Sequence, residues 1–312
     1  MVGQRVVVRR VLRGETGPSG GPAMTDVLGV CESWDEQRVV VRRERGDLVE
    51  IATADVVSGK PVPPRASPYR RLDAVAADRL ALPGWQPVES EPLGEWVLRA
   101  AGGFSSRANS VLALGDPGVP SGEALTRVEE WYAARGLPPR AHVHPGSPAA
   151  DTLAGAGWTA YDETLLMLAS VAKVLRRLGR PTDPLEVQHS AHVDDGWRAT
   201  DPRAARHGQP ARRVLEAGQV TLATVRDASG EVLARGRGAF HGDWVGVSSL
   251  WTRPDLRRTG LGRAVLADLL DWGAERGAST TYLQVVAENI GARRTYDACG
   301  YEVHHAYAYL TP

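Results

Sequence analysis

Glycines and arginines gather in one stretch of the chain in a pattern suited to holding an anion. Gly260 and Gly262 allow the backbone to turn sharply, so that several N–H groups converge at the positive end of a helix dipole. Arginines on both sides add positive charge. We interpret the segment as a phosphate-binding loop, whose candidate residues are Arg257, Arg258, Thr259, Gly260, Leu261, Gly262 and Arg263.

The residues on either side predict the elements that position this loop. A strand precedes it, and a helix follows up to Gly277, because Leu266, Leu269 and Leu270 recur at helical spacing. The loop is not a dinucleotide fingerprint, which needs three glycines, and it lacks the Gly-Lys-Ser/Thr ending of a nucleotide P-loop. A glycine turn in an ordinary α/β domain is the alternative interpretation.

A second motif follows one strand later. After residues 281–286, which we predict as a strand, come Ala287-Glu288-Asn289 and a short helix. The two motifs, Arg257-x-x-Gly260-x-Gly262 and Asn289-x-x-Ala292-x-x-x-Tyr296, resemble those of the GNAT acetyltransferases in order and spacing.

The resemblance implies roles for these residues. The loop would hold the pyrophosphate of acetyl-CoA, and Asn289 and Ala292 would join it to the helix. Backbone groups of Leu250, Trp251 and Thr252 would pair with the pantetheine arm and polarise the thioester.

Tyr296 is the proton donor to the departing thiolate that the resemblance implies. The alternative is a core aromatic residue that packs under Gly300. For the general base, the candidates are Glu288, Asp243 and a water molecule relayed by either. No cysteine stands where an acyl-enzyme would form, which favours direct transfer in a ternary complex.

The rest of the chain suggests three domains. Short valine-rich strands in residues 1–62 predict a small β-barrel, with a turn at Arg45-Gly46-Asp47. It resembles the SH3-like domain at the N-terminus of some actinobacterial GNAT proteins, several of them named histone acetyltransferases. We expect the barrel either to bind a partner or to cover a neighbouring domain.

Residues 69–170 and 185–312 follow the same order of strands and helices, so the chain resembles a tandem GNAT. Trp131-Tyr-Ala-Ala-Arg-Gly136 aligns with Trp272-Gly-Ala-Glu-Arg-Gly277. In the first copy the loop becomes Asp116-Pro-Gly-Val-Pro-Ser121, where two prolines remove backbone donors and the aspartate repels phosphate. We therefore expect a degenerate first copy and a catalytic second copy.

The predicted fold class is thus α/β (α+β): a small SH3-like β-barrel followed by two GNAT-like mixed-sheet modules. In the first copy we expect a helix over 69–82 and a strand over 106–114, with Arg107 and Asn109 either lining a cleft or capping a turn. In the second copy we expect few helices around Asp194-Asp195-Gly196-Trp197.

The amino-acid composition argues against some classes of binding partner. The 37 basic residues balance 37 acidic ones, so the protein has no net charge that would attract it to nucleic acid or to anionic lipid. Cys31 and Cys299 lie far apart, and His189 and His192 lack the spacing of a metal site, so we expect no metal. We find no apolar run long enough to span a membrane or serve as a signal peptide, and predict a cytoplasmic protein.

The leading hypothesis is an acetyl-CoA-dependent N-acetyltransferase. Its acceptor would be an amine, either a small molecule, as for tandem-GNAT mycothiol synthases, or a protein lysine or N-terminus. The alternative from another class is an acyl-CoA-binding regulator whose barrel contacts a partner and whose catalysis is vestigial. An intact loop beside Tyr296 favours the enzyme, because a sensor needs no proton donor.

Overall fold

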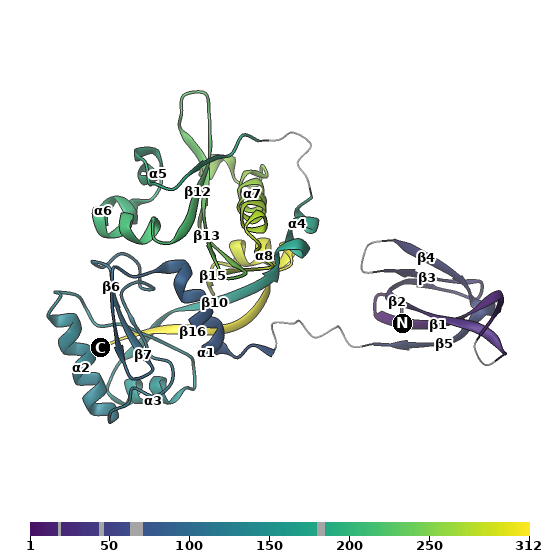
Figure 1. The fold of residues 1–312 in the computed structure, drawn as a ribbon, viewed down its shortest axis with the longest axis horizontal. Coiled ribbons are helices and arrows are strands. Elements are labelled where there is room, and N and C mark those ends of the chain that lie inside the picture. The colour runs from purple at the N-terminus through teal and green to yellow at the C-terminus, as the bar shows by residue number, and fades with distance from the viewer. Residues whose placement is uncertain (18–19, 44–46, 63–70, 180–184) are drawn as a thin grey trace. The chain divides into compact units, whose positions relative to one another are not determined.

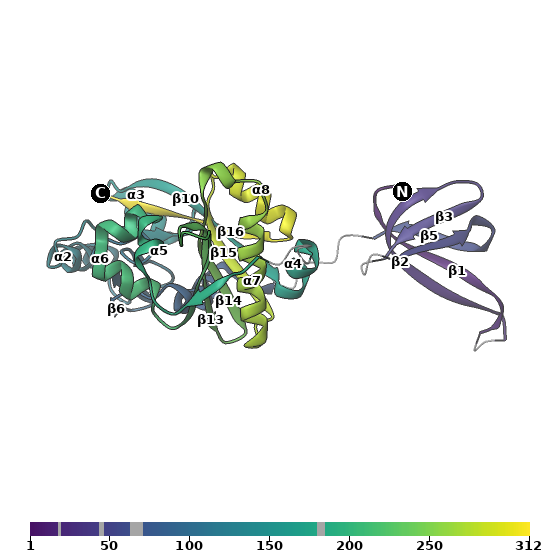
Figure 2. The ribbon, with the colours of Figure 1, turned by 90° about the horizontal axis from the view of Figure 1, so that it is seen from above.

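The computed structural model describes residues 1–17, 20–43, 47–62, 71–179 and 185–312 of the 312-residue chain. Its contacts divide it into two compact units, Met1–Arg70 and Arg71–Pro312, which we describe separately (Figures 1 and 2). Arg45 and Gly46, from the turn predicted in the first unit, lie outside the described residues.

The N-terminal unit is an antiparallel sheet of five strands in the order β4-β3-β2-β1-β5. Alternate side chains of β1 point to opposite faces, so that Val6 and Val8 are buried and join Val27, Val41 and Ile51 in an apolar core. The strands are β1 Arg5–Thr16, β2 Pro22–Trp34, β3 Arg38–Arg42, β4 Leu48–Ala52 and β5 Val56–Pro61, with the short 3-10 helix η1 at Thr53–Asp55.

The C-terminal unit is built on one mixed sheet of 11 strands in the order β11-β12-β13-β14-β15-β10-β16-β9-β8-β7-β6 (Figure 1). The predicted mixed α/β class is confirmed. The strands are β6 Glu89–Leu93, β7 Trp96–Ala100, β8 Val111–Leu112, β9 Ala141–Val143, β10 Thr159–Ser170, β11 Gln188–Ser190, β12 Gln219–Arg226, β13 Val232–His241, β14 Trp244–Thr252, β15 Thr280–Val286 and β16 Glu302–Thr311.

Helices cover this sheet. Their bounds are α1 Ala74–Ala81, η3 Leu82–Trp85, α2 Ser121–Ala133, α3 Pro148–Gly155, α4 Val171–Leu178, α5 Asp195–Ala199, α6 Pro202–Leu215, η4 Pro254–Leu256, α7 Leu261–Glu275 and α8 Ile290–Cys299. In the described part of the chain, no helix is both long and apolar enough to cross a membrane.

Strand exchange joins the two copies predicted from the sequence. β10, the last strand of the first copy, pairs with β15 of the second copy, and β16, the last strand of the second copy, pairs with β9 of the first. β10 and β16 also pair with each other. Each copy therefore completes its part of the sheet with a strand from the other copy.

Each copy also contains one parallel pair, β8 with β9 and β14 with β15. On one face of the second copy, α7 packs so closely that Gly273 leaves no room for a Cβ, which would lie 2.9 Å from Val245 Cβ. On the other face, the end of α1 and η3 contact the sheet: the Tyr282 hydroxyl donates to Ala81 O of α1, and Arg237 donates to Gly84 O of η3.

The expectation of few helices after Ala191 was wrong, because α5 and α6 occupy residues 195–215. Asp194 and Asp201 cap them by accepting bonds from backbone N–H groups. Pro210 and a kink at Gly208 break the helical periodicity of α6, which hides it in the sequence.

The strand expected over 106–114 is much shorter. Most of it is a turn around Asn109, whose side chain bonds the backbone of residues 101, 103, 104 and 105. Asn109 is therefore a turn-forming residue and not part of a cleft.

Candidate active site

The centre of the candidate site is the point where two parallel strands diverge. β14 and β15 pair from Trp244 and Thr280 as far as Val247 and Leu283. The remaining residues of β14 continue to pair with β13, across a bulge in which Ser249 has a φ of 54°. Beyond Val247, β14 no longer pairs with β15, so within the described residues the edge of residues 250–252 that faces away from β13 has no strand partner.

Arg235 holds this bulge in place, and sequence reasoning missed it. Its guanidinium donates to Ser249 O at 2.6 Å and to Thr200 O at 3.0 Å, and it lies 3.3 Å from the Asp201 carboxylate. Burial lowers the pKa of Arg235 to about 10, which leaves it charged at neutral pH. Its neighbours in the sequence give no sign of this role, because its partners lie in β14 and in the loop between α5 and α6.

The glycine loop lies against the end of β14. Gly260 caps α7 in a left-handed conformation with a φ of 98°, and a Cβ at Gly262 would lie 3.1 Å from Thr252 Oγ1. Leu261 packs against the main core, while Arg257 and Arg258 are exposed beside the helix N-terminus. The loop thus combines a helix dipole with exposed cations at one end of the bulged strand.

Two further loop residues have local partners. The Thr259 hydroxyl donates to Leu256 O at 2.7 Å. Arg263 donates to the carbonyls of Arg177 and Leu178 at 3.4 and 3.5 Å, so its charge lies toward the end of α4.

The corresponding loop of the first copy satisfies its donors internally. The Asp116 N–H donates to the Glu95 carboxylate at 2.7 Å, and the Gly118 N–H donates to Asp116 Oδ1 at 2.8 Å. Pro120 stands at the N-cap of α2. Acidic side chains thus occupy the place where a phosphate would need donors.

Tyr296 and Asn289 both lie on α8. The Asn289 side chain caps the helix by accepting a bond from the Ala292 N–H at 3.1 Å. Tyr296 packs against the same core as Leu250, Leu261 and Ala292, with its ring centroid 5.9 Å from that of Tyr301. Burial raises the pKa of Tyr296 to about 12, which keeps the phenol protonated at neutral pH.

Glu288 and Trp251 are placed differently. Glu288 is exposed in the turn before α8. Trp251 is half-buried, with the charged end of Arg235 5.9 Å from its ring centroid. The structure therefore brings Tyr296 and the bulged strand to one core and leaves Glu288 at the surface.

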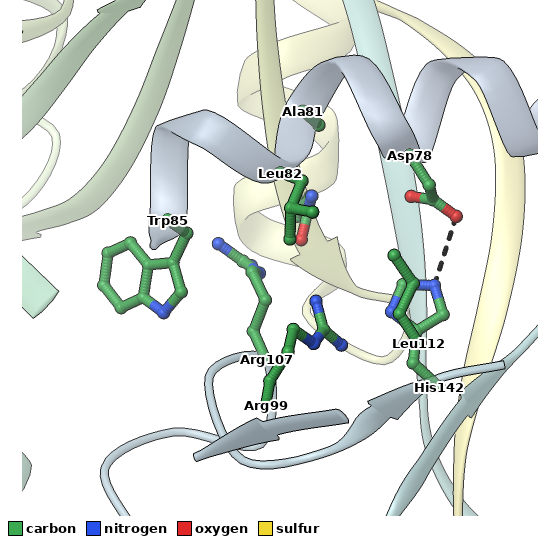
Figure 3. Close-up of a pocket in the computed structure, with 9 residues that line it drawn as sticks. Asp78, Ala81, Leu82, Trp85, Arg99, Arg107, Leu112 and His142 are labelled. Carbon is green, nitrogen blue, oxygen red and sulfur yellow. Dashed lines mark hydrogen bonds and ion pairs between the residues drawn. The ribbon is translucent and has the colours of Figure 1, made fainter. Parts of the chain in front are cut away.

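Two small adjoining cavities lie between the α1–η3 segment and the sheet. One is lined by Gly246, Val247 and Ser248, where β14 and β15 begin to diverge. The other is lined by Asp78, Arg99 and His142 (Figure 3). Residues common to both are Ala81, Trp85, Arg107 and Gln284.

Arg107 is the charged group that both cavities share. Figure 3 shows its side chain and that of Arg99 extending toward the α1–η3 segment. Its guanidinium carbon lies 5.3 Å from the Trp85 ring centroid, and its buried Nε has no hydrogen-bond partner within the described residues. Of the two residues expected to line a cleft or cap a turn, Arg107 therefore lines a cavity.

Comparison with known proteins identifies the family. A family model described as "Probable histone acetyltransferase Rv0428c C-terminal" matches residues 66–310, and one described as "Rv0428c N-terminal Sm-like domain" matches residues 1–60. The chain belongs to this family of GNAT N-acetyltransferases. Its N-terminal unit is a small β domain of the Sm-like kind, and the finer SH3-like resemblance stays a prediction.

Individual proteins agree with this assignment. The GNAT chain is 28% identical to the "Probable histone acetyltransferase Rv0428c" of Mycobacterium tuberculosis, over 99% of the chain and 95% of that protein. It is 35% identical to a mycothiol acetyltransferase of Clavibacter sepedonicus, over 52% of the chain and 59% of that protein. A GCN5-related N-acetyltransferase from Kribbella flavida shares the fold, with a TM-score of 0.56 at 19% identity, covering 79% of the chain and 96% of that structure.

Proposed function

We propose that this GNAT chain transfers the acetyl group of acetyl-CoA to an amine, and that residues 185–312 carry the catalytic site. The observation that carries the proposal is the bulged end of β14 beside the N-terminus of α7. Together they offer backbone donors for an extended pantetheine arm and a charged helix end for a pyrophosphate. The first copy, residues 69–170, is then a scaffold.

The chain's residues would divide the chemistry as follows. Backbone N–H groups of residues 250–252 polarise the thioester carbonyl, and the amine nitrogen attacks its carbon. When the C–S bond breaks, the Tyr296 phenol gives its proton to the thiolate sulfur, and the proton lost by the amine goes to water or to Glu288. Because Glu288 is exposed, we favour a water molecule as the first proton acceptor.

Proline substitution tests the cofactor site. Gly260→Pro cannot keep a φ of 98° and should abolish acetyl-CoA binding in calorimetry. Gly118→Pro is the matched control, because Gly118 has a φ of 72° in the first-copy loop. We expect the control to bind one acetyl-CoA per chain. Two equivalent sites, or normal binding by Gly260→Pro, would contradict the proposal.

We infer that the amine approaches from the side of the cavities next to Val247; each cavity has room for about one water molecule, so η3 would have to move to admit it. They lie on the side of the sheet covered by η3, and their shared cation, Arg107, favours an acceptor that carries an anionic group beside its amine. The relatives' names leave two acceptor classes open, a small-molecule amine and a protein lysine or N-terminus. Mass spectrometry of amine, peptide and protein libraries after incubation with labelled acetyl-CoA distinguishes them.

An acyl-CoA-binding regulator is the remaining alternative. The placement of Tyr296 against the same core as Leu250 favours the enzyme, because binding alone needs no acid there. If labelled acetyl-CoA binds but no amine in any library gains the label, the regulator becomes the better account. The small β domain would then be the place to look for a partner.

A further inference from the structure

Three histidines converge on one buried carboxylate in the C-terminal unit. Oδ2 of Asp78, on α1, lies 3.1 Å from His142 Nε2, 2.7 Å from His144 Nε2 and 3.2 Å from His305 Nε2. His142 lies on β9, His144 follows that strand, and His305 lies on β16. Asp78 and His142 are almost fully buried, while His144 and His305 keep 15% and 11% of their side chains exposed.

Hydrogen bonding to the carboxylate does not explain this arrangement well. A carboxylate has about four acceptor positions over its two oxygens, or about two for each oxygen. Here three ring nitrogens approach the same oxygen, Asp78 Oδ2. Such crowding of nitrogen and oxygen atoms is typical of ligands that share a cation.

A count of protons shows that the cluster needs one more positive charge. Leu72 O lies 2.8 Å from His304 Nε2, His304 Nδ1 lies 2.8 Å from His305 Nδ1, and His305 Nε2 faces Asp78. The carbonyl and the carboxylate at the two ends only accept, so these three contacts need three hydrogens. Two neutral imidazoles carry two. Either a third proton, which makes one imidazole cationic, or a metal ion in place of the hydrogen between His305 Nε2 and Asp78 completes this chain of contacts.

With a metal in that position, the outer contacts of His305 and His304 are satisfied as well, whereas the buried His142 Nδ1 has no partner within the described residues. His305 Nδ1–H would donate to His304 Nδ1, and His304 Nε2–H would donate to Leu72 O. Metal-binding histidines commonly donate their second ring N–H in this way, which fixes the ring orientation.

We propose that one divalent transition metal binds four side chains at this point: Asp78, His142, His144 and His305. Three nitrogens and one oxygen suit zinc, whose bonds of about 2.0–2.1 Å place tetrahedral ligand atoms roughly 3.3 Å apart. The ligand atoms of Asp78, His142 and His144 all lie within 4.8 Å of one another. His305 Nε2 lies 3.2 Å from Asp78 Oδ2 but outside that group of three, so its ring has to shift toward the other two histidines to become the fourth ligand. This proposal departs from the expectation, drawn from sequence spacing, that the chain holds no metal.

The location indicates a structural role. The four ligands come from α1, from the end of the first copy's β9 and from the second copy's β16, which pair with each other. A closed four-ligand site there would fasten α1 and the two exchanged copies together. Such a role does not depend on acetyl transfer, so its tests are independent of the proposed activity.

Cobalt binding tests the site directly. Full-length protein without an affinity tag is stripped with a chelator and titrated with Co²⁺, whose visible absorption reports tetrahedral coordination. We expect one Co²⁺ per chain, displaced by Zn²⁺, and a higher Tm in the presence of zinc. His144→Asn should bind at least about tenfold more weakly, since even outer-shell partners of a metal cost that much.

His207→Asn is the matched control, because His207 is a half-buried histidine of the same unit that lies apart from Asp78 and contacts Gly102 O at 3.1 Å. It should bind Co²⁺ as the unmodified protein does. The proposal fails if the unmodified protein takes up neither metal at micromolar concentrations, or if His144→Asn binds as tightly as the control. It also fails if nitrogen NMR shows a third proton shared by His304 and His305 that zinc does not displace.

Discussion

Replacing Tyr296 with phenylalanine separates binding from chemistry at the proposed site. The ring would keep its place against the core and near Tyr301. Within the described residues the Tyr296 hydroxyl has no hydrogen-bond partner, so its removal should cost little stability. Acetyl-CoA affinity should therefore stay within a few-fold of the original.

Turnover should fall, because the phenol gives its proton to the leaving thiolate. Loss of a general acid typically costs about 10²-fold to 10⁴-fold in rate, or about 2.7 to 5.4 kcal/mol in the barrier. Since a coenzyme A thiolate is a fair leaving group by itself, we expect the low end of this range. The assay is release of free thiol with the best acceptor found, at saturating acetyl-CoA.

The pH dependence gives an independent check. An acid works only while protonated, and burial raises the pKa of Tyr296 to about 12. The rate should therefore persist past pH 10, where a tyrosine with its usual pKa of about 10 is half ionised. Tyr161→Phe, away from α8, serves as the control. Full turnover by Tyr296→Phe would show that the tyrosine is core packing and would refute the assignment.

Three further outcomes follow from the structure. Deletion of residues 1–62 should leave acetyl-CoA affinity within a few-fold, since the C-terminal unit has its own core; a folded truncation that no longer binds would refute this. Arg235→Met removes the ion-pair partner of the buried Asp201 carboxylate and should lower the free energy of unfolding by about 3–5 kcal/mol, measured by urea denaturation. Arg253→Met, which removes the more exposed ion pair with Glu231, should lower it by less than about 1 kcal/mol. Burial raises the pKa values of Tyr132 and Tyr282 to about 12. Between pH 10 and 12 these two tyrosines therefore ionise in the unfolded chain but not in the folded one, so their full contribution to the free energy of unfolding should be present below pH 10 and decrease as the pH rises to 12. A Tm that stays constant from pH 10 to 12 would contradict this.

The sequence by itself determined the local features of the second copy. Gly260 forms the left-handed cap of α7, and Asn289 caps α8 by bonding the Ala292 N–H, three residues on. Such features depend on residues a few positions apart, so a short segment contains all the information they need.

Sequence reasoning was weaker where local signals disagreed. In α6, Gly208 and Pro210 break the apolar periodicity, although Asp201 and Pro202 form a strong helix start. The helix persists because Val214 and Leu215 are fully buried on its inner face. Tertiary packing there outweighs the preferences of two helix-breaking residues.

Only the tertiary structure decided which strands the two copies exchange and which residues gather around Asp78 and around Arg235. The contacts of Asp78 with His142 and His305 span 64 and 227 residues, and the pair of Arg235 with Ser249 depends on a bulge in another strand. Alternation shows that a segment is a strand, but backbone hydrogen bonds are the same for every neighbour and cannot select the partner. That choice depends on how all the side chains of the sheet and its covering helices pack together, which no short segment contains.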